Sequence, residues 1–111
     1  METNRQKRIS RLLQKDLGEI LQQEGRAWFP GALITVTKVQ VTSDLGLAKT
    51  YLSIFGKGAP ETLKLVETHT KEIRHQLGLR VKNQLRHIPD LRFYIDDSLD
   101  YIENIERLLK E

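Results

Sequence analysis

One helical period runs from Leu63 to Ile88, and its length is the strongest constraint on the fold of this 111-residue chain. Apolar residues recur there at i, i+3 and i+4 spacing, and Pro89 ends the pattern because proline cannot continue a helix. A straight helix of ~28 residues would be ~42 Å long, against roughly 30 Å for a domain of this size. We therefore predict a bend at Gly78, with Thr70 as the alternative position.

A second helical period occupies residues 4–24. Its apolar residues lie on one arc of a helical wheel: Ile9, Leu12, Leu13, Leu17, Ile20 and Leu21. Thr3 and Gln6 have the spacing of a capping box at the start of this helix, and Gly25 is expected to close its end.

Three stretches are predicted as β-strands, because they alternate apolar and polar residues and are rich in β-branched side chains. They are residues 33–42, 47–55 and 91–95. The first two are expected to form an antiparallel hairpin around the turn at 43–46. The apolar parity changes near Thr37, which predicts a β-bulge there or burial of both faces.

The segments outside these elements include two large apolar residues and the C-terminal end. Trp28 and Phe29 are expected to cover one end of the core, the alternative being that they stack on a nucleobase. After the third strand, Asp97 or Ser98 is expected to cap a last helix over residues 99–111. The predicted order is α-β-β-α-α-β-α.

Charge is distributed unevenly along the chain. Residues 1–88 hold 15 Lys/Arg and 8 Asp/Glu, whereas residues 89–111 hold 3 Lys/Arg and 7 Asp/Glu. A cationic body of this kind favours a polyanionic partner. The chain has no cysteine, no apolar run near ~20 residues and no hydrophobic signal core at its start, so we expect a cytoplasmic protein without disulfides or a membrane span.

The pattern of potential catalytic and metal-binding residues gives no reason to expect an enzyme. His69, His75 and His87 are 6 and 12 residues apart, which is not the spacing of a helical metal pair. The adjacent Asp96 and Asp97 would point to opposite faces of a strand, so they are interpreted as helix-capping residues. We expect no metal and no cofactor.

Two cationic stripes are the main functional candidates, and we expect them to line one surface. On the first helix, the side of the wheel opposite the apolar arc carries Arg8, Arg11 and Lys15. On the long helix, the corresponding side carries His75, Lys82 and Arg86, with Arg80 and His87 beside them. Arg74 falls inside the apolar arc and is expected to extend to solvent or to form a pair.

Residues 73–89 contain no Asp or Glu, so these cations have no acidic i, i+4 partners. An unmixed face of this kind suits phosphate groups better than an ordinary solubilising surface. Aromatic residues are sparse on both stripes, which favours contact with an RNA backbone or duplex over base stacking. The predicted RNA-binding residues are Arg8, Arg11, Lys15, His75, Arg80, Lys82 and Arg86.

Four stretches of the sequence resemble the bacterial ribosome-binding factor A family, and together they span most of the chain. They are QKDLGEIL, VTKVQVTSDLGLAKTYLSIFG, EIRHQLG and LRHIPDLRFYIDDSL. The family has a type II KH fold without the GxxG loop of ordinary KH domains. It usually carries an Ala-x-Gly kink before its Ile-Arg pair, and this chain has His69-Thr70-Lys71 there instead.

The resemblance implies an α+β fold, with residues 1–111 as a single KH-like RNA-binding domain and 99–111 as a helical extension. A three-stranded sheet would be covered by helices on one face. The implied function is a monomeric assembly factor that binds the immature small (30S) ribosomal subunit and its 16S rRNA. Such a factor supports late maturation, rRNA processing and growth in the cold, without a small-molecule substrate. The alternative is a non-enzymatic module whose basic helices dock on an acidic protein.

Overall fold

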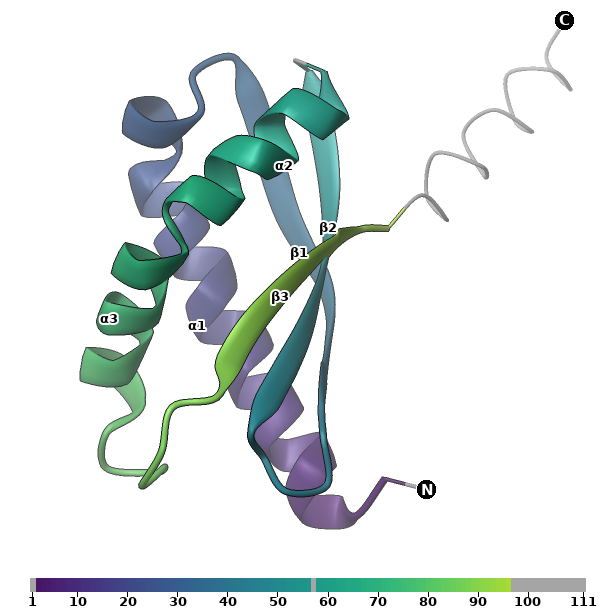
Figure 1. Cartoon of the computed structure of the whole chain (residues 1–111), viewed down its shortest axis with the longest axis vertical. Coiled ribbons are helices and arrows are strands. Elements are labelled where there is room, and N and C mark those ends of the chain that lie inside the picture. The colour runs from purple at the N-terminus through teal and green to yellow at the C-terminus, as the bar shows by residue number, and fades with distance from the viewer. Residues whose placement is uncertain (1, 57, 97–111) are drawn as a thin grey trace, which may run out of the picture.

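Three helices cover one face of a three-stranded sheet in residues 2–56 and 58–96, the part of the chain that the computed structural model describes (Figure 1). The elements in chain order are α1 (Asn4–Trp28), β1 (Ala32–Val41), β2 (Leu47–Gly56), α2 (Ala59–Thr68), α3 (Thr70–Val81) and β3 (Asp90–Ile95). This confirms the predicted α-β-β-α-α-β order. The helix predicted over 99–111 and its caps, Asp97 and Ser98, lie outside the described residues. No helix of the described part is long and apolar enough to cross a membrane.

Helix α1 begins as predicted and ends later. The hydroxyl of Thr3 accepts a hydrogen bond from the Gln6 backbone N–H (3.1 Å), and the Gln6 side chain accepts one from the Thr3 N–H (2.8 Å). Gly25 does not close the helix. It lies inside the last turn, where its carbonyl accepts a hydrogen bond from the Phe29 N–H (3.0 Å). Phe29 is 1% exposed, which confirms its predicted place in the core.

Strands β1 and β2 form the predicted antiparallel hairpin, with the predicted bulge at Thr37. The pairing register shifts between Val36 and Lys38. The Thr37 hydroxyl donates a hydrogen bond to the Asp96 carboxylate (2.6 Å), and its oxygen also lies 3.2 Å from the Tyr51 carbonyl oxygen. Because the bulge adds one residue, apolar side chains on both sides of it point into the same core.

Strand β3 pairs in parallel with β2, so the sheet order is β1-β2-β3. Parallel neighbours need a crossover connection. Helices α2 and α3 supply it, and they pack on the same face of the sheet as α1 (Figure 1).

The long helical period is broken at His69, between α2 and α3. His69 has φ −97° and ψ 13°, outside helical geometry, and its imidazole Nδ1 lies 2.8 Å from the Leu65 carbonyl oxygen. The Trp28 ring stacks on the His69 ring with centroids 4.4 Å apart. The prediction of a bend at Gly78 is therefore wrong, and the alternative position near Thr70 is confirmed.

Gly78 lies inside α3 and has a packing role. A Cβ atom at this position would lie 3.3 Å from Cγ1 of Ile88, which is tighter than ordinary van der Waals contact. The glycine therefore lets the chain after α3 approach the helix closely. The expectation that the helix continues to Ile88 is also wrong, because α3 ends at Val81 and the following residues form turns and a loop.

Arg74 holds this returning loop in place. Its guanidinium donates hydrogen bonds to the backbone carbonyls of Ile88 (2.7 Å) and Pro89 (3.2 Å), and its Nε lies 3.8 Å from an Asp90 carboxylate oxygen. The expected pairing of Arg74 is confirmed. Because the loop is fixed against α3, its side chains have a defined position relative to the helix.

The hairpin turn contains an acidic residue, Asp44, whose charge is stabilised by one side-chain and one backbone hydrogen bond. The Asp44 carboxylate accepts hydrogen bonds from the Thr42 hydroxyl (2.6 Å) and from the Gly46 N–H (2.9 Å). These hydrogen bonds, that from Thr42 above all, lower the pKa of Asp44 below its ordinary value.

A lowered pKa in the folded state makes Asp44 stabilising above its unfolded-state pKa of about 4, and this contribution is lost as pH falls through the folded-state pKa. Asp44→Ala is therefore expected to lower the melting temperature at pH 7, and the difference from the original protein should shrink by pH 3. Thermal unfolding followed by circular dichroism at both pH values checks this, with Ser43→Ala as the control. A difference that is equal at both pH values would contradict the prediction.

Candidate nucleic-acid interface

The three predicted residues of the first stripe lie on the solvent side of α1. Arg8, Arg11 and Lys15 are all exposed, and the opposite side of the helix carries the buried residues that pack on the sheet. They take part in no ion pair within the described residues. Their charge is therefore available to an external anion.

A basic groove lies between α3 and the loop that returns to β3. Its volume is about 780 Å³, and its wall includes five basic or imidazole side chains and one carboxylate. We call it the α3 groove, and these side chains are Lys71, Arg74, His75, Arg86, His87 and Asp90. It brings together His75 and Arg86, which were predicted to face one direction on a single helix but come from a helix and a loop.

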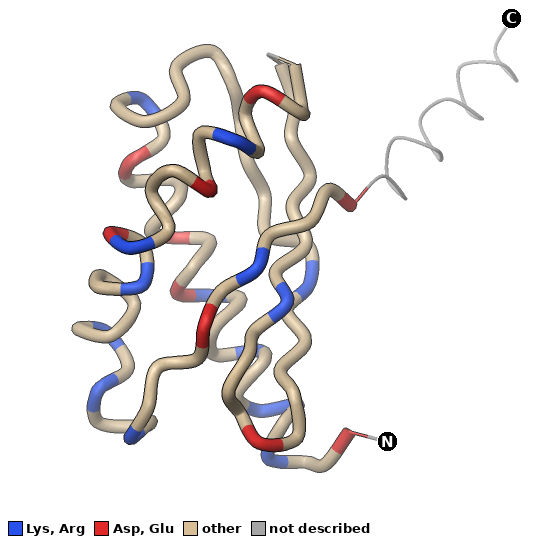
Figure 2. The backbone as a smooth tube through the Cα atoms, viewed as in Figure 1, with Lys and Arg blue, Asp and Glu red and all other residues tan. Residues whose placement is uncertain are grey.

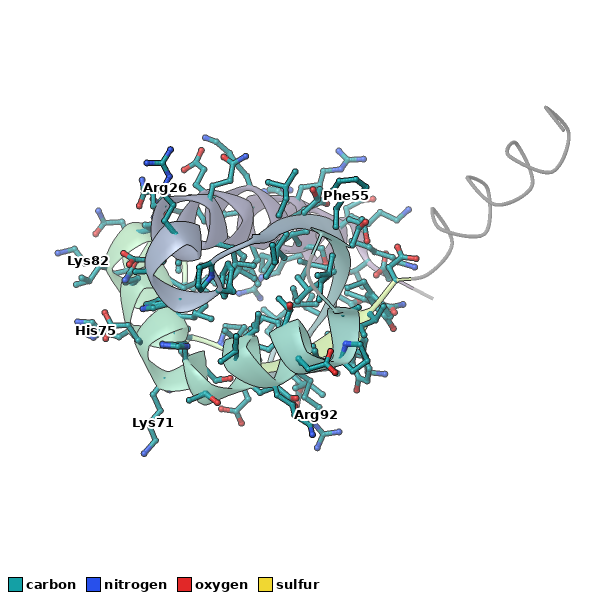
Figure 3. The ribbon with its side chains drawn as sticks, turned by 90° about the horizontal axis from the view of Figure 1, so that it is seen from above. Arg26, Phe55, Lys71, His75, Lys82 and Arg92 are labelled. Atoms are coloured by element: carbon teal, nitrogen blue, oxygen red, sulfur yellow. The ribbon has the colours of Figure 1, made fainter. Side chains whose placement is uncertain are left out.

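Lys82 lies outside this groove, in the turn that follows α3. Figure 3 shows Lys82 and His75 projecting outward on one side of the protein, and Lys71 projecting from the adjoining corner. Figure 2 shows further Lys and Arg positions in the loop beyond α3 and along the first half of α1. The cationic surface therefore extends beyond the groove itself.

Arg80 is in a different environment from the other candidates. Its guanidinium forms salt bridges with the carboxylates of Asp16 and Glu19 of α1, and it donates a hydrogen bond to the side-chain oxygen of Gln23 (3.3 Å). Residues 73–89 supply no acidic i, i+4 partner, as predicted, but acids of α1 pair with Arg80 and Asp90 pairs with Arg74, so the expected unmixed cationic face does not extend to these two residues. Contact between Arg80 and RNA stays a prediction, but part of its charge is already neutralised.

This polar contact also separates the two stripes. Acidic side chains of α1 line the boundary between α1 and α3: Asp16 and Glu19 face Arg80, and Glu24 accepts a hydrogen bond from Gln76 (3.4 Å). The stripes were expected to line one surface. The acids between them divide that surface into the outer side of α1 and the α3 groove.

Replacing Arg80 is expected to affect stability more than binding. Asp16 is 9% exposed, so Arg80→Gln leaves a nearly buried carboxylate without its cation and should cost about 1–3 kcal/mol of unfolding free energy. Urea denaturation measures this cost. Lys82→Gln is the matched control, because Lys82 is exposed and forms no ion pair within the described residues. Equal effects from the two substitutions would contradict a structural role for Arg80.

The sequence interpretation missed two of the groove's basic side chains and placed a third outside the main stripe. Lys71 and Arg74 were not named as RNA-binding candidates, and His87 was placed to one side. The spacing of Lys71 and His75, four residues apart on one helix, is a local signal for a shared face. The contribution of the loop depends on its return against Gly78, which no local pattern indicates.

The arrangement of these elements and most of the chain's residues match one known family. The family model described as ribosome-binding factor A matches residues 5–109. This chain belongs to the ribosome-binding factor A family. Ribosome-binding factor A of Flavobacterium johnsoniae is 53% identical, over 98% of this chain and 85% of that protein, and the one from Chlorobium luteolum is 40% identical, over 97% and 91%.

Solved structures support the same fold. The crystal structure of ribosome-binding factor A from Thermus thermophilus superposes with a TM-score of 0.71, at 21% identity, over 81% of this chain and 94% of that chain. A homology model of the Thermus thermophilus protein, fitted into a cryo-EM map of its complex with 30S, has a TM-score of 0.64 at 24% identity, covering 79% and 91%. At these identities, the structural similarity shows the fold alone. The function of this chain is therefore inferred from its own residues.

Proposed function

We propose that this chain binds the small ribosomal subunit through its 16S rRNA in the cytoplasm, and supports late maturation and rRNA processing without catalysis. Residues 1–111 act as one KH-like RNA-binding domain, with 99–111 as an extension. The observation that carries the proposal is the α3 groove, whose wall has five basic or imidazole side chains and one carboxylate. Membership of the ribosome-binding factor A family supports the choice of partner.

The groove and the α1 stripe suit an RNA backbone. Guanidinium and ammonium groups donate hydrogen bonds to phosphate oxygens and neutralise their charge. The α1 stripe carries Arg8, Arg11 and Lys15, and none of its members is aromatic. Recognition by charge and shape across a folded rRNA surface fits this composition better than base readout.

The salt dependence of binding tests the proposal. If about four cations meet phosphates, log affinity for purified small subunits should fall with log salt concentration at a slope of roughly −3 to −4. Co-sedimentation of the protein with small subunits across a salt series measures this slope. A flat dependence, or no binding at low salt, would contradict contact through the phosphate backbone.

A docking module for an acidic protein would share the salt dependence but differ in its response to nuclease. Treatment of the small subunits with ribonuclease should release this chain if rRNA is the ligand, and should leave a protein complex intact. In cells that lack the protein, unprocessed small-subunit rRNA should accumulate. Normal rRNA processing in such cells would argue against a role in maturation.

A further inference from the structure

The face of the sheet that carries no helix has a composition unlike that of the basic helices. Along each strand, the residues that alternate with the buried ones point to this side. They include two tyrosines, three cations, one carboxylate and two exposed apolar residues. We call this surface the open sheet face, and these residues are Leu33, Lys38, Lys49, Tyr51, Phe55, Asp90, Arg92 and Tyr94.

Three of these residues form a row across all three strands. Lys38 pairs with Tyr51, and Tyr51 pairs with Tyr94, in the observed register. The two tyrosine rings are stacked, with centroids 5.4 Å apart and planes at 26°, and the Lys38 ammonium lies 5.9 Å from the Tyr51 centroid. Tyr94, on the edge strand β3, is 37% exposed. The stack therefore ends in a partly exposed aromatic ring at the edge of the sheet.

The neighbouring row carries two cations. Lys49 of β2 pairs in register with Arg92 of β3, one row from the tyrosines. In the described part of the chain, neither of them nor Lys38 takes part in an ion pair. Of the acids of this edge, Asp90 lies 3.8 Å from Arg74, and Asp96 accepts a hydrogen bond from Thr37.

On the other side of the tyrosine row from Lys49 and Arg92, the open sheet face carries apolar side chains. Leu33 and Phe55 are paired across β1 and β2, and they are 57% and 70% exposed. Figure 3 shows Phe55 and Arg92 projecting outward from the protein. Exposed apolar and aromatic groups lie next to cations that form no ion pair within the described residues. Such a surface suits a single-stranded nucleic acid, whose unpaired bases can stack on rings and whose phosphates attract cations.

We propose that the open sheet face binds a single-stranded RNA segment, with a base stacked on the Tyr51–Tyr94 pair and phosphates held by Lys38, Lys49 and Arg92. The proposal rests on the proposed function in taking RNA as the ligand, but it uses the solvent side of the sheet, which meets the helices only at the edge strand β3, where Arg92 and Tyr94 line a hollow with Glu67 of α2. Stacking on aromatic rings in a sheet tolerates any base, but a base can stack there only when it is not paired in a duplex. The surface therefore selects unpaired strands over duplex.

A cross-strand tyrosine pair also stabilises a sheet without any ligand. The two roles differ in their consequences for binding. A purely structural pair requires no neighbouring cations, and its removal would lower stability while leaving RNA affinity unchanged. A binding pair makes affinity depend on the rings and on the cations of the next row.

Fluorescence anisotropy of a labelled short single-stranded oligoadenylate, measured with the full chain, tests the proposal. Tyr51→Ala with Tyr94→Ala should weaken binding at least tenfold, and Tyr51→Phe with Tyr94→Phe should preserve it within about twofold, because stacking needs only the ring. With three phosphate contacts, the salt slope should be near −2. Lys49→Gln with Arg92→Gln should reduce its magnitude by about 1.4.

The Lys49 and Arg92 pair also covers the case in which the alanine variant fails to fold, because glutamine keeps a long side chain at each position and removes only the charge. A Lys71→Gln, Lys82→Gln and Arg86→Gln variant separates this inference from the proposed function. That variant should lose affinity for small subunits and keep its affinity for the oligonucleotide. The inference is overturned if the original protein does not bind the oligonucleotide, or if neither set of sheet variants weakens binding. A different outcome would assign the face to a protein partner instead. In that case the original protein still binds small subunits treated with ribonuclease, and the sheet variants bind them more weakly.

Discussion

Exchanging Arg8, Arg11, Lys82 and Arg86 for glutamate together is expected to lower affinity for small ribosomal subunits by about three orders of magnitude. Each exposed cation that meets a phosphate contributes up to about 1 kcal/mol, and 1.4 kcal/mol corresponds to a factor of ten. Loss of four contacts, with repulsion added by the new carboxylates, therefore removes binding at physiological salt. Co-sedimentation with purified subunits over a range of protein concentrations measures the change.

The four positions are chosen so that the fold is left intact. All four side chains are exposed, and none forms an ion pair within the described residues. Circular dichroism and thermal unfolding should therefore match the original protein. A variant with the same four positions exchanged between Arg and Lys keeps the charge and should keep most of the affinity. A glutamate variant that co-sediments normally would reject the proposed interface.

Splitting this variant in two shows which surface carries the affinity. Glutamate at Arg8 and Arg11 changes only α1, and glutamate at Lys82 and Arg86 changes only the end of α3 and its loop. The acids between the two surfaces, Asp16 among them, separate the stripes. Additive losses are therefore expected for the two halves, because distant sites contribute independently.

The local features of this fold were predictable from the sequence because their causes lie within a few residues. Thr3 and Gln6 cap α1 through neighbouring backbone groups, and the parity change around Thr37 marks the bulge because side chains alternate along a strand. The hairpin follows from two alternating stretches around a short turn. In each case, a nearby set of residues specifies the geometry.

The break in the long helix was misplaced because one of the contacts at the break comes from a residue that is distant in the sequence. His69 is held by stacking on Trp28, and the interruption is so short that the apolar period of α2 and α3 continues across it. Gly78 has the low helix propensity expected of a bend. In the structure, the absence of a side chain at Gly78 instead lets Ile88 pack closely against the helix.

The same limit applies to the binding site. Arg80 has no acidic residue near it in the sequence, yet its partners Asp16 and Glu19 lie 64 and 61 residues away on α1. In the α3 groove the tertiary fold adds charge where at Arg80 it neutralises charge. The loop that carries Arg86 folds back onto α3 and increases the positive charge there. Sequence patterns identify which segments are cationic, and the tertiary fold decides which of those charges remain free.

Gly56→Ala is expected to lower the unfolding free energy by about 2–4 kcal/mol. Gly56 has φ +102°, a conformation that alanine adopts only with strain, and a Cβ atom there would lie 2.5 Å from the backbone carbonyl oxygen of Gly31. The obstructing atom belongs to the backbone of the turn that leads into β1, so relief requires that this turn or the end of β2 move.

Gly18→Ala provides a control of the same chemistry with the opposite expected sign. Gly18 lies within α1, and a Cβ atom there would meet no atom within 4 Å. Alanine is favoured over glycine in a helix interior by up to about 1 kcal/mol, so this variant should be more stable than the original protein. Urea denaturation of both variants measures the two changes on one scale.

If Gly56→Ala unfolds at the same urea concentration as the original protein, the close approach of the two strand ends does not limit stability. If Gly18→Ala is also destabilised, the effect belongs to the added methyl group in general and not to the geometry at Gly56.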